Sequence, residues 1–349
     1  MNTETEPIFS STGRLGVSRR QYERLYVNGT RFSSDPQEVE RNFQRLTAIG
    51  ERNVQRIGRS IFRGAVSDEV MSHISRNGLQ HHLEVAFPLE EFTGDNSWLI
   101  YMANNRSGRE QIVPHNIMVR ETEFQKSEIM PADRIRSVIE RGYAFTNQIP
   151  ENQVDQVHSL WGETFGWERH EVDNLRRRLE TASKKNPSQR DVWFGAIRDN
   201  GNIISAAMAE RLTVPAENGM LDLVESTEWR TRDEYAGKGL MTAALAILNA
   251  QILSNLQEDR DTLPLIYAEC NFQSRSDRAG YGAGFRIPYR TQEGYPAPQI
   301  LVQNVLVRDG SQIEEGRLRD FTFMYLPRSV IQRDYSPVQT NILVGILQS

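Results

Sequence analysis

Apolar residues in the first third of the chain recur at helical spacing and then at strand spacing. After Ser34-Asp35-Pro36, which is typical of a helix start, they fall mostly three or four apart, and this predicts a helix over about 36–61. A shorter helix is expected over 68–76, and the alternation from Leu83 to Phe87 is typical of a half-buried strand. The strands expected here are 79–89, 97–103 and 111–120.

From Pro131 onward the pattern changes to helices and strands in alternation. Helical spacing predicts a linking helix over 133–142 and two helices between 150 and 180. Asn200-Gly201, between two apolar runs, is a strong hairpin signal. The strands expected are 191–197, 203–212, 221–231, 264–270, 299–307 and 319–326, and the later helices are 238–256 and 272–282. We therefore divide the chain into an N-terminal α+β unit, 1–130, a second domain, 131–330, and a C-terminal tail, 331–349.

Composition places the chain among globular proteins. Its 349 residues can bury a sizeable core, a quarter of them are charged, and the formal net charge of −5 argues against a general binder of nucleic acid or anionic membranes. No apolar run approaches the ~20 residues that span a bilayer, and we expect a cytoplasmic protein. The single cysteine, Cys270, is expected to be a small buried residue. His81 and His82 lie on a predicted strand, where neighbours face opposite ways, so no metal site is expected.

The most informative stretch is residues 221–245, LDLVESTEWRTRDEYAGKGLMTAAL. A β-prone segment turns through Gly237 and Gly239 into an alanine- and leucine-rich helix, and such a turn is an anion site because the first N–H groups of the helix have no helical partners. A P-loop would need Ser or Thr after Lys238, and a dinucleotide fingerprint would need a small residue where Thr242 stands. Both matches to these phosphate loops are therefore weak.

The stretch resembles the signature loop of the GNAT acyltransferase superfamily, Gln/Arg-x-x-Gly-x-Gly/Ala. Glu234 takes its first position and Gly237 and Gly239 its glycines; the run from Thr227 to Leu240 looks most like the bacterial β-lysine acetyltransferase branch. A second piece follows in the expected order: the apolar strand PLIYAEC, then Asn271, a short helix, and Gly284-Phe285. The resemblance covers roughly 135–330 and leaves the first 130 residues unassigned.

The resemblance implies both a fold and a cosubstrate. The fold is α/β (α+β): a mixed, mostly antiparallel sheet flanked by helices, in which two central strands splay apart. The cosubstrate is acetyl-CoA, with its pyrophosphate on the glycine loop and with no metal. The implied cofactor-binding residues are Trp229, Thr231, Arg232, Ala236, Gly237, Lys238, Gly239, Leu240, Met241 and Asn271.

Acetyl transfer to an amine needs a proton acceptor for the amine and a proton donor for the leaving thiolate. Glu225 and Glu228 lie on the strand that the family uses for the acceptor; a regular strand would point them to opposite faces unless a bulge intervenes, and the resemblance favours Glu228. Many family members place the donor tyrosine where this chain has Gly280, so Tyr281 is one residue late. We keep Glu228, Glu225 and Tyr281 as the catalytic candidates.

Several of these residues have a second interpretation. Trp229 can belong to the core instead of the pocket, Arg232 and Lys238 can be solvated surface charges, and Asn271 can cap the helix that follows it. The cluster Arg176-Arg177-Arg178 is most simply a solvated helix face, with contact to a CoA phosphate or an acidic partner as the alternative.

The sequence therefore predicts an N-acyltransferase that moves an acetyl group from acetyl-CoA directly to a primary amine, on a small metabolite by resemblance. One alternative keeps the fold and takes a protein or peptide amine as acceptor. Another is a catalytically degenerate CoA-binding interaction module. The N-terminal unit is expected to shape the acceptor pocket or to form a subunit contact in a homodimer.

Overall fold

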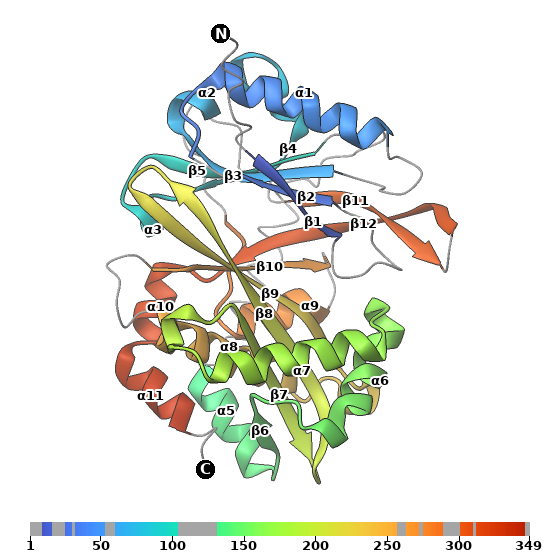
Figure 1. Ribbon diagram of the computed structural model, residues 1–349. Coiled ribbons are helices and arrows are strands. Elements are labelled where there is room, and N and C mark those ends of the chain that lie inside the picture. The colour runs from blue at the N-terminus through green and yellow to red at the C-terminus, as the bar shows by residue number, and fades with distance from the viewer. Residues whose placement is uncertain are drawn as a thin grey trace. The chain divides into compact units, whose positions relative to one another are not determined.

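A computed structural model describes residues 9–15, 25–29, 32–52, 60–103, 131–256, 263–271, 275–288, 301–309 and 312–345. The chain forms two compact units, each assembled from several segments (Figure 1). The first comprises Met1–Ile112, Thr213–Leu221 and Pro288–Phe323, and the second comprises Val113–Leu212, Asp222–Ile287 and Met324–Ser349. The boundary predicted near residue 130 adjoins a stretch outside the described residues and stays a prediction.

The first unit contains a five-stranded sheet in the order β1-β2-β3-β5-β4. Strands β2 and β3 are parallel, and the pairs β1–β2, β3–β5 and β4–β5 are antiparallel. The strands are β1 (Phe9–Leu15), β2 (Leu25–Gly29), β3 (Ser60–Ser67), β4 (Leu83–Pro88) and β5 (Ser97–Ala103). Its helices are α1 (Pro36–Arg52), α2 (Asp68–Arg76) and α3 (Glu90–Thr93), and β11 (Leu301–Asp309) pairs antiparallel with β12 (Gln312–Tyr325).

The predicted elements of this unit are largely confirmed, with two corrections. Helix α1 ends at Arg52, and Ile61, placed at the end of the predicted helix, lies in β3 and is fully buried. Residues 79–82 form a 3-10 turn instead of the start of a strand. Side chains of α1, α2 and one face of the sheet form a single apolar core. The apolar spacing predicted these elements correctly where only one face of the helix or strand is buried. The strand predicted over 111–120 lies outside the described residues.

The second unit is built on the strand order β10-β9-β8-β7-β6. The pairs β6–β7 and β7–β8 are antiparallel, whereas β9 and β10 are parallel. The strands are β6 (Ala144–Thr146), β7 (Val192–Asp199), β8 (Asn202–Ala216), β9 (Gly219–Thr231) and β10 (Leu265–Asn271). The predicted hairpin is confirmed: Asn200 and Gly201 have φ values of 48° and 83°, as its two-residue turn requires. The mixed sheet flanked by helices agrees with the expected fold class.

Helices cover both faces of this sheet (Figure 1). On β7, the Phe194 ring packs against Trp161 of α6 at 6.0 Å between centroids, while Gly195 lies against Ala244 and Leu248 of α8. Neighbouring strand residues point to opposite faces, so α6 and α8 lie on opposite sides. The helices are α5 (Pro131–Glu140), α6 (Val154–Phe165), α7 (Arg169–Ser183), α8 (Leu240–Leu256), α9 (Arg275–Gly282), α10 (Arg328–Asp334) and α11 (Pro337–Gly345).

The last two helices were not anticipated, because the sequence interpretation assigned no element to residues 331–349. Helix α11 packs on α8, and Tyr335, fully buried after α10, donates a hydrogen bond of 2.7 Å to the carbonyl oxygen of Ala283. Asn249 of α8 is also fully buried and bonds both of these groups at 3.4 Å. The C-terminal segment thus supports the turn that ends α9.

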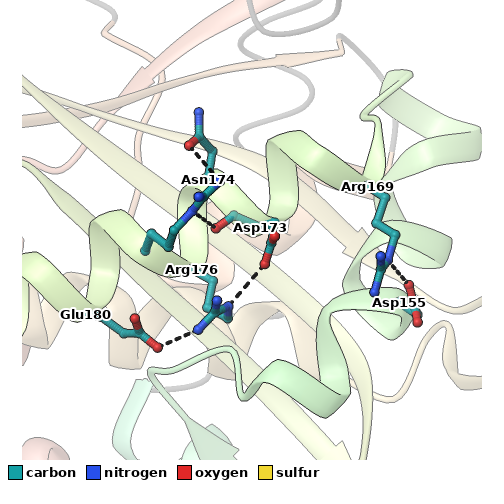
Figure 2. Close-up of polar contacts among 7 residues, drawn as sticks. Asp155, Arg169, Asp173, Asn174, Arg176 and Glu180 are labelled. Carbon is teal, nitrogen blue, oxygen red and sulfur yellow. Dashed lines mark hydrogen bonds and ion pairs between the residues drawn. The ribbon is translucent and has the colours of Figure 1, made fainter.

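The arginine cluster on α7 is engaged by nearby groups. Figure 2 shows Arg176 between Asp173 and Glu180, with N–O distances of 3.2 and 2.6 Å. Arg178 binds Glu210 of β8 at 2.6 Å. Arg177 donates to Asp173 and Asn174 of its own helix. These contacts favour the simpler interpretation of a helix face whose charges are paired locally.

A buried ion pair ties β8 to β9. Arg211 and Asp222 form two hydrogen bonds of 2.7 Å, and their side chains are only 11% and 4% exposed. Arg211 also donates to the carbonyl oxygen of Ser188 at 2.7 Å. Removal of one member leaves a buried charge without compensation, which is strongly destabilising.

We expect Asp222→Asn to lower the free energy of unfolding by about 3–5 kcal/mol, measured by urea denaturation. The matched control is Asp155→Asn, which removes the pair with Arg169 drawn in Figure 2. Those side chains are 73% and 67% exposed, and such pairs contribute about 0–1 kcal/mol. Equal effects of the two substitutions would contradict the role assigned to burial.

Candidate functional site

The central strands of the second unit separate. Strands β9 and β10 pair through Leu223↔Leu265, Val224↔Ile266 and Glu225↔Tyr267, and no later pair is formed within the described residues, although β9 continues to Thr231. The end of β9 therefore has an edge that β10 does not cover. Free strand edges carry N–H and C=O groups that an extended ligand can pair with.

The backbone of β9 is irregular just beyond this point. Glu228 has φ of +58°, a left-handed conformation that costs a residue with a Cβ about 1–2 kcal/mol. Its side chain is 6% exposed, whereas Glu225 is partly exposed and accepts a hydrogen bond of 3.1 Å from the Tyr267 hydroxyl. A left-handed residue interrupts the alternation of a strand, as a bulge does. The rule that residues three apart on a regular strand face opposite sides therefore does not apply to Glu225 and Glu228.

After β9 the chain makes the glycine loop. A 3-10 turn, Asp233–Tyr235, leads into Gly237 and Gly239, whose φ values are +79° and +73°. The first helical bond of α8 runs from the Ala243 N–H to the Gly239 carbonyl oxygen. The N–H groups of residues 240–242 thus have no partner within the helix, and the helix dipole adds positive potential at the same place.

A pocket of about 720 Å³ lies over this loop. Its walls come from the end of β9, the loop, the first turn of α8, helix α9 and one residue of α5. The predicted site residues that line it are Trp229, Thr231, Ala236, Gly237, Gly239, Leu240, Met241 and Tyr281. The arrangement brings together segments that are far apart along the chain, from Arg134 of α5 to Gly282 of α9.

Other predicted site residues lie outside the lining of this pocket. Arg232 begins the 3-10 turn, and Lys238 is exposed, with its ammonium 4.6 Å from the centre of the Tyr235 ring. Glu225 and Glu228 precede the part of β9 that lines it. Asn271 is the last residue of β10, and its side chain lies outside the described residues.

Helix α9 explains where Tyr281 points. Gly280 is packed so closely against Trp229 that an added Cβ would lie 3.0 Å from the indole ring. A tyrosine at 280 could not be accommodated without displacing Trp229. Tyr281, one residue on, is 4% exposed and lines the pocket, and the Arg286 guanidinium carbon lies 3.9 Å from its ring centre. The shift by one residue therefore keeps a tyrosine at the pocket wall.

Trp229 belongs to both core and pocket. Its ring packs against Phe285 at 5.6 Å between centroids and donates to the Ser226 hydroxyl at 3.0 Å, while the same side chain lines the pocket. The two interpretations of this residue are compatible, because an indole is large enough to have one face in each environment.

Sequence reasoning missed about half of the lining. These residues are Arg134, Arg230, Asp233, Tyr235, Thr242, Ser276, Arg278, Ala279 and Gly282. Those next to the loop could have been included by proximity along the chain. Arg134 had no such signal, because it comes from α5, roughly a hundred positions earlier.

The charges around the loop are mainly positive. Burial, and secondarily the nearby Arg141, lower the pKa of Arg134.

The hydroxyl of Tyr235 donates to Asp199 at 2.7 Å, and this hydrogen bond raises the tyrosine pKa. Tyr235 is thereby tied to the end of β7 and holds the turn that precedes the glycines.

Residues considered for other chemistry lie apart from this pocket. Cys270 is buried, and that burial raises the pKa of its thiol well above its usual value, as expected for a core residue. Among the described residues, no group of His, Cys, Asp and Glu could hold a metal ion. The described part of the chain also has no helix long and apolar enough to cross a membrane.

No family model and no curated protein matches the chain. Solved structures do match it. Arabidopsis thaliana NAA60 with a bisubstrate analogue is 13% identical over 53% of this chain and 98% of its own, with a TM-score of 0.36. A putative GNAT-family acetyltransferase from Desulfovibrio desulfuricans is 16% identical over 53% of this chain and 98% of its own, with a TM-score of 0.33. The Escherichia coli ribosomal-protein-S18-alanine N-acetyltransferase is 14% identical over 53% of this chain and 93% of its own, with a TM-score of 0.31.

One of these solved structures is described as a GNAT-family acetyltransferase and another as an N-acetyltransferase. The helices and strands of the second unit also follow one another in the order that the sequence resemblance led us to expect. With identities and TM-scores this low, the function has to be inferred from the geometry of the pocket itself.

The contact between α9 and Trp229 gives a test of the pocket wall. We expect Gly280→Ala to destabilise the protein, because overpacking typically costs about 1–3 kcal/mol, more than the ~1 kcal/mol that alanine gains in a helix. The near-ultraviolet circular dichroism of the indole should change with it. Gly345→Ala in α11 is the control, since nothing lies within 4 Å of the added methyl group. A Gly280→Ala protein as stable as this control would show that the wall is loose.

Proposed function

We propose that the chain is an N-acyltransferase that uses acetyl-CoA and acetylates a primary amine. The observation that carries this proposal is the meeting of three features in one pocket: a glycine loop at the start of α8, an uncovered edge of β9, and a buried tyrosine on α9. The first suits a diphosphate, the second an extended amide-containing arm, and the third a leaving group that needs a proton.

The glycine loop supports the diphosphate end of the donor. The N–H groups of residues 240–242, which have no partner within the helix, favour an anion, as do the helix dipole and the pocket arginines. A Cβ on Gly237 would meet no protein atom within 4 Å, so the space over this glycine is open to a ligand. The groups present therefore fit a diphosphate.

The uncovered edge of β9 supports the pantetheine arm. Main-chain groups of residues 229–231 lie beyond the last pairing with β10, and Trp229 and Thr231 line the pocket. An arm with two amide groups can pair with such an edge as an added strand would. This alignment leads from the glycine loop toward the point where the strands separate.

Direct transfer requires two proton movements. The amine nitrogen attacks the thioester carbonyl carbon and the carbon–sulfur bond breaks, so one proton must leave the amine and one must reach the sulfur. We assign the first to Glu228, with Glu225 as the alternative, and the second to Tyr281. Proximity and orientation of the two substrates supply much of the remaining acceleration.

Glu228 is preferred for two reasons. It falls where the resembled β-lysine acetyltransferase branch has its acidic residue, and its strained, buried position is of the kind that clusters at functional sites. Glu225 is held by Tyr267 at the point of strand separation, which also suits binding of a cationic amine.

The acceptor is proposed to be an amine on a small metabolite, on the strength of that motif. A protein or peptide amine is the second candidate, and a degenerate CoA-binding module is the third. A free-thiol assay over small amines and peptides, combined with CoA binding, separates them: binding without turnover on any amine favours the module.

CoA binding should depend on Gly237. We expect Gly237→Val to abolish detectable CoA binding in isothermal titration, because valine resists φ of +79° and crowds the diphosphate. Gly201→Val is the matched control: Gly201 has φ of +83° and equally open space, but it lies in the hairpin turn away from the pocket. The control should lose stability and keep CoA affinity, and equal CoA affinity in both variants would refute the loop assignment.

Turnover should depend on the Glu228 carboxylate. We expect Glu228→Gln to lower kcat by roughly 10²–10⁴-fold with CoA affinity nearly unchanged, because the amide keeps the shape and cannot accept the proton. Glu228→Gly should be as inactive and yet no less stable, since glycine adopts φ of +58° without strain. Unchanged turnover of Glu228→Gln across pH would transfer the role to Glu225.

A further inference from the structure

Helix α5 contributes to the pocket although it precedes the part of the chain that carries the recognisable motifs. Arg134 lines the pocket, and its Nη1 lies 2.8 Å from where a Cβ of Gly239 would be. Arg141, just after the helix, donates through Nη2 to the carbonyl oxygen of Lys238 at 2.9 Å. The two arginines are seven positions apart, two helical turns, and both reach the glycine loop.

Among the described residues, no carboxylate forms an ion pair with Arg134 or Arg141. Within the part of the chain that the structure describes, the Nε of Arg134 is buried without a hydrogen-bond partner. Arg136 of the same helix differs: it binds Asp133 at 3.2 Å and is 70% exposed. A guanidinium at the pocket wall beside a helix N-terminus favours an anion in the pocket.

Gly239 and Arg134 are fitted to each other. A methyl group at 239 would collide with the guanidinium and with Cδ of Arg134, at 2.8 and 2.9 Å. The φ of +73° favours glycine at this position, and any side chain there would also have to displace the Arg134 side chain. The guanidinium of Arg134 therefore lies directly over the Gly239 backbone.

The contact of Arg141 orients the loop backbone. A trans peptide places C=O and N–H on opposite sides, so the hydrogen bond to the Lys238 carbonyl turns the Gly239 N–H away from Arg141. Arg141 touches the loop and is absent from the pocket wall, which makes it a positioning residue.

We propose that Arg134 binds the diphosphate of the acyl-CoA donor from the α5 side, and that Arg141 positions the loop for it. This inference rests on the proposed function. A planar guanidinium can donate two parallel hydrogen bonds to adjacent phosphate oxygens, and a diphosphate supplies enough negative charge to satisfy Arg134 together with the start of α8.

The test compares Arg134→Gln, Arg134→Lys and Arg136→Gln of the full chain by isothermal titration with CoA and with S-acetylpantetheine, which has no diphosphate. Hydrogen bonds to charged groups contribute about 1.5–3 kcal/mol, so Arg134→Gln should weaken CoA about 10- to 150-fold. Its affinity for S-acetylpantetheine should be unchanged, and CoA binding should become less sensitive to salt. Arg134→Lys should lose part of the affinity, because an ammonium group cannot make the paired contact.

The control Arg136→Gln should behave as the unmodified protein. An Arg134→Gln protein that binds CoA as tightly as this control overturns the inference. Arg141→Met should weaken CoA and retain the salt sensitivity, because the residue acts through the loop; loss of that sensitivity would make Arg141 a direct ligand and overturn its positioning role.

The outcome for the unmodified protein separates the two proposals. If it does not bind CoA, the proposed function fails, and inorganic pyrophosphate in a thermal-shift assay then tests the arginine site alone. Stabilisation of the unmodified protein and of Arg136→Gln, but not of Arg134→Gln, would support a diphosphate site without CoA. No stabilisation of any of them would overturn this inference as well.

Discussion

The separation of β9 from β10 after Glu225 is the constraint on which the second unit depends. Two parallel strands that stay paired satisfy each other's N–H and C=O groups and leave no room for a ligand. Here, among the described residues, the pairing with β10 ends at Glu225 although β9 continues to Thr231, and the left-handed Glu228 lies in this last part of the strand. The same part of β9 then delivers Trp229 and Thr231 to the pocket. Without the separation, the glycine loop would be an ordinary connection between a strand and a helix.

The surroundings keep this open arrangement rigid. Trp229 is wedged between Gly280 and Phe285, and Tyr335 with Asn249 holds the turn that ends α9. On the other side of β9, the buried pair of Arg211 and Asp222 ties it to β8. Apart from the Arg211–Asp222 pair, which joins consecutive strands, these contacts come from segments far apart along the chain. A pocket that must align a backbone edge, a helix N-terminus and a tyrosine needs such support, because small displacements between them weaken all three contacts at once.

Positive potential at the loop has two sources, of which only one can be predicted from the sequence. The N–H groups and dipole of α8 follow from a strand, glycines and a helix in succession, and this succession is plain in the sequence. The guanidinium of Arg134 arrives from α5 and leaves no pattern near the loop. The Arg134 side chain lies where a Cβ of residue 239 would be, and this position is a glycine. Glycines at anion sites are thus informative about both the ligand and the neighbours.

The sequence by itself predicted most helices and strands of the second unit, the hairpin at Asn200-Gly201 and the turn through Gly237 and Gly239, because each depends on contacts within a few residues. It placed Ile61 wrongly in a helix, since fully buried strands and helix faces are both apolar, and it assigned no element to the C-terminal helices. Only the tertiary structure decided that Tyr281 and not Gly280 faces the pocket, and that Arg134 joins the site. These outcomes depend on which distant segments pack together, and no local pattern of residues contains that information.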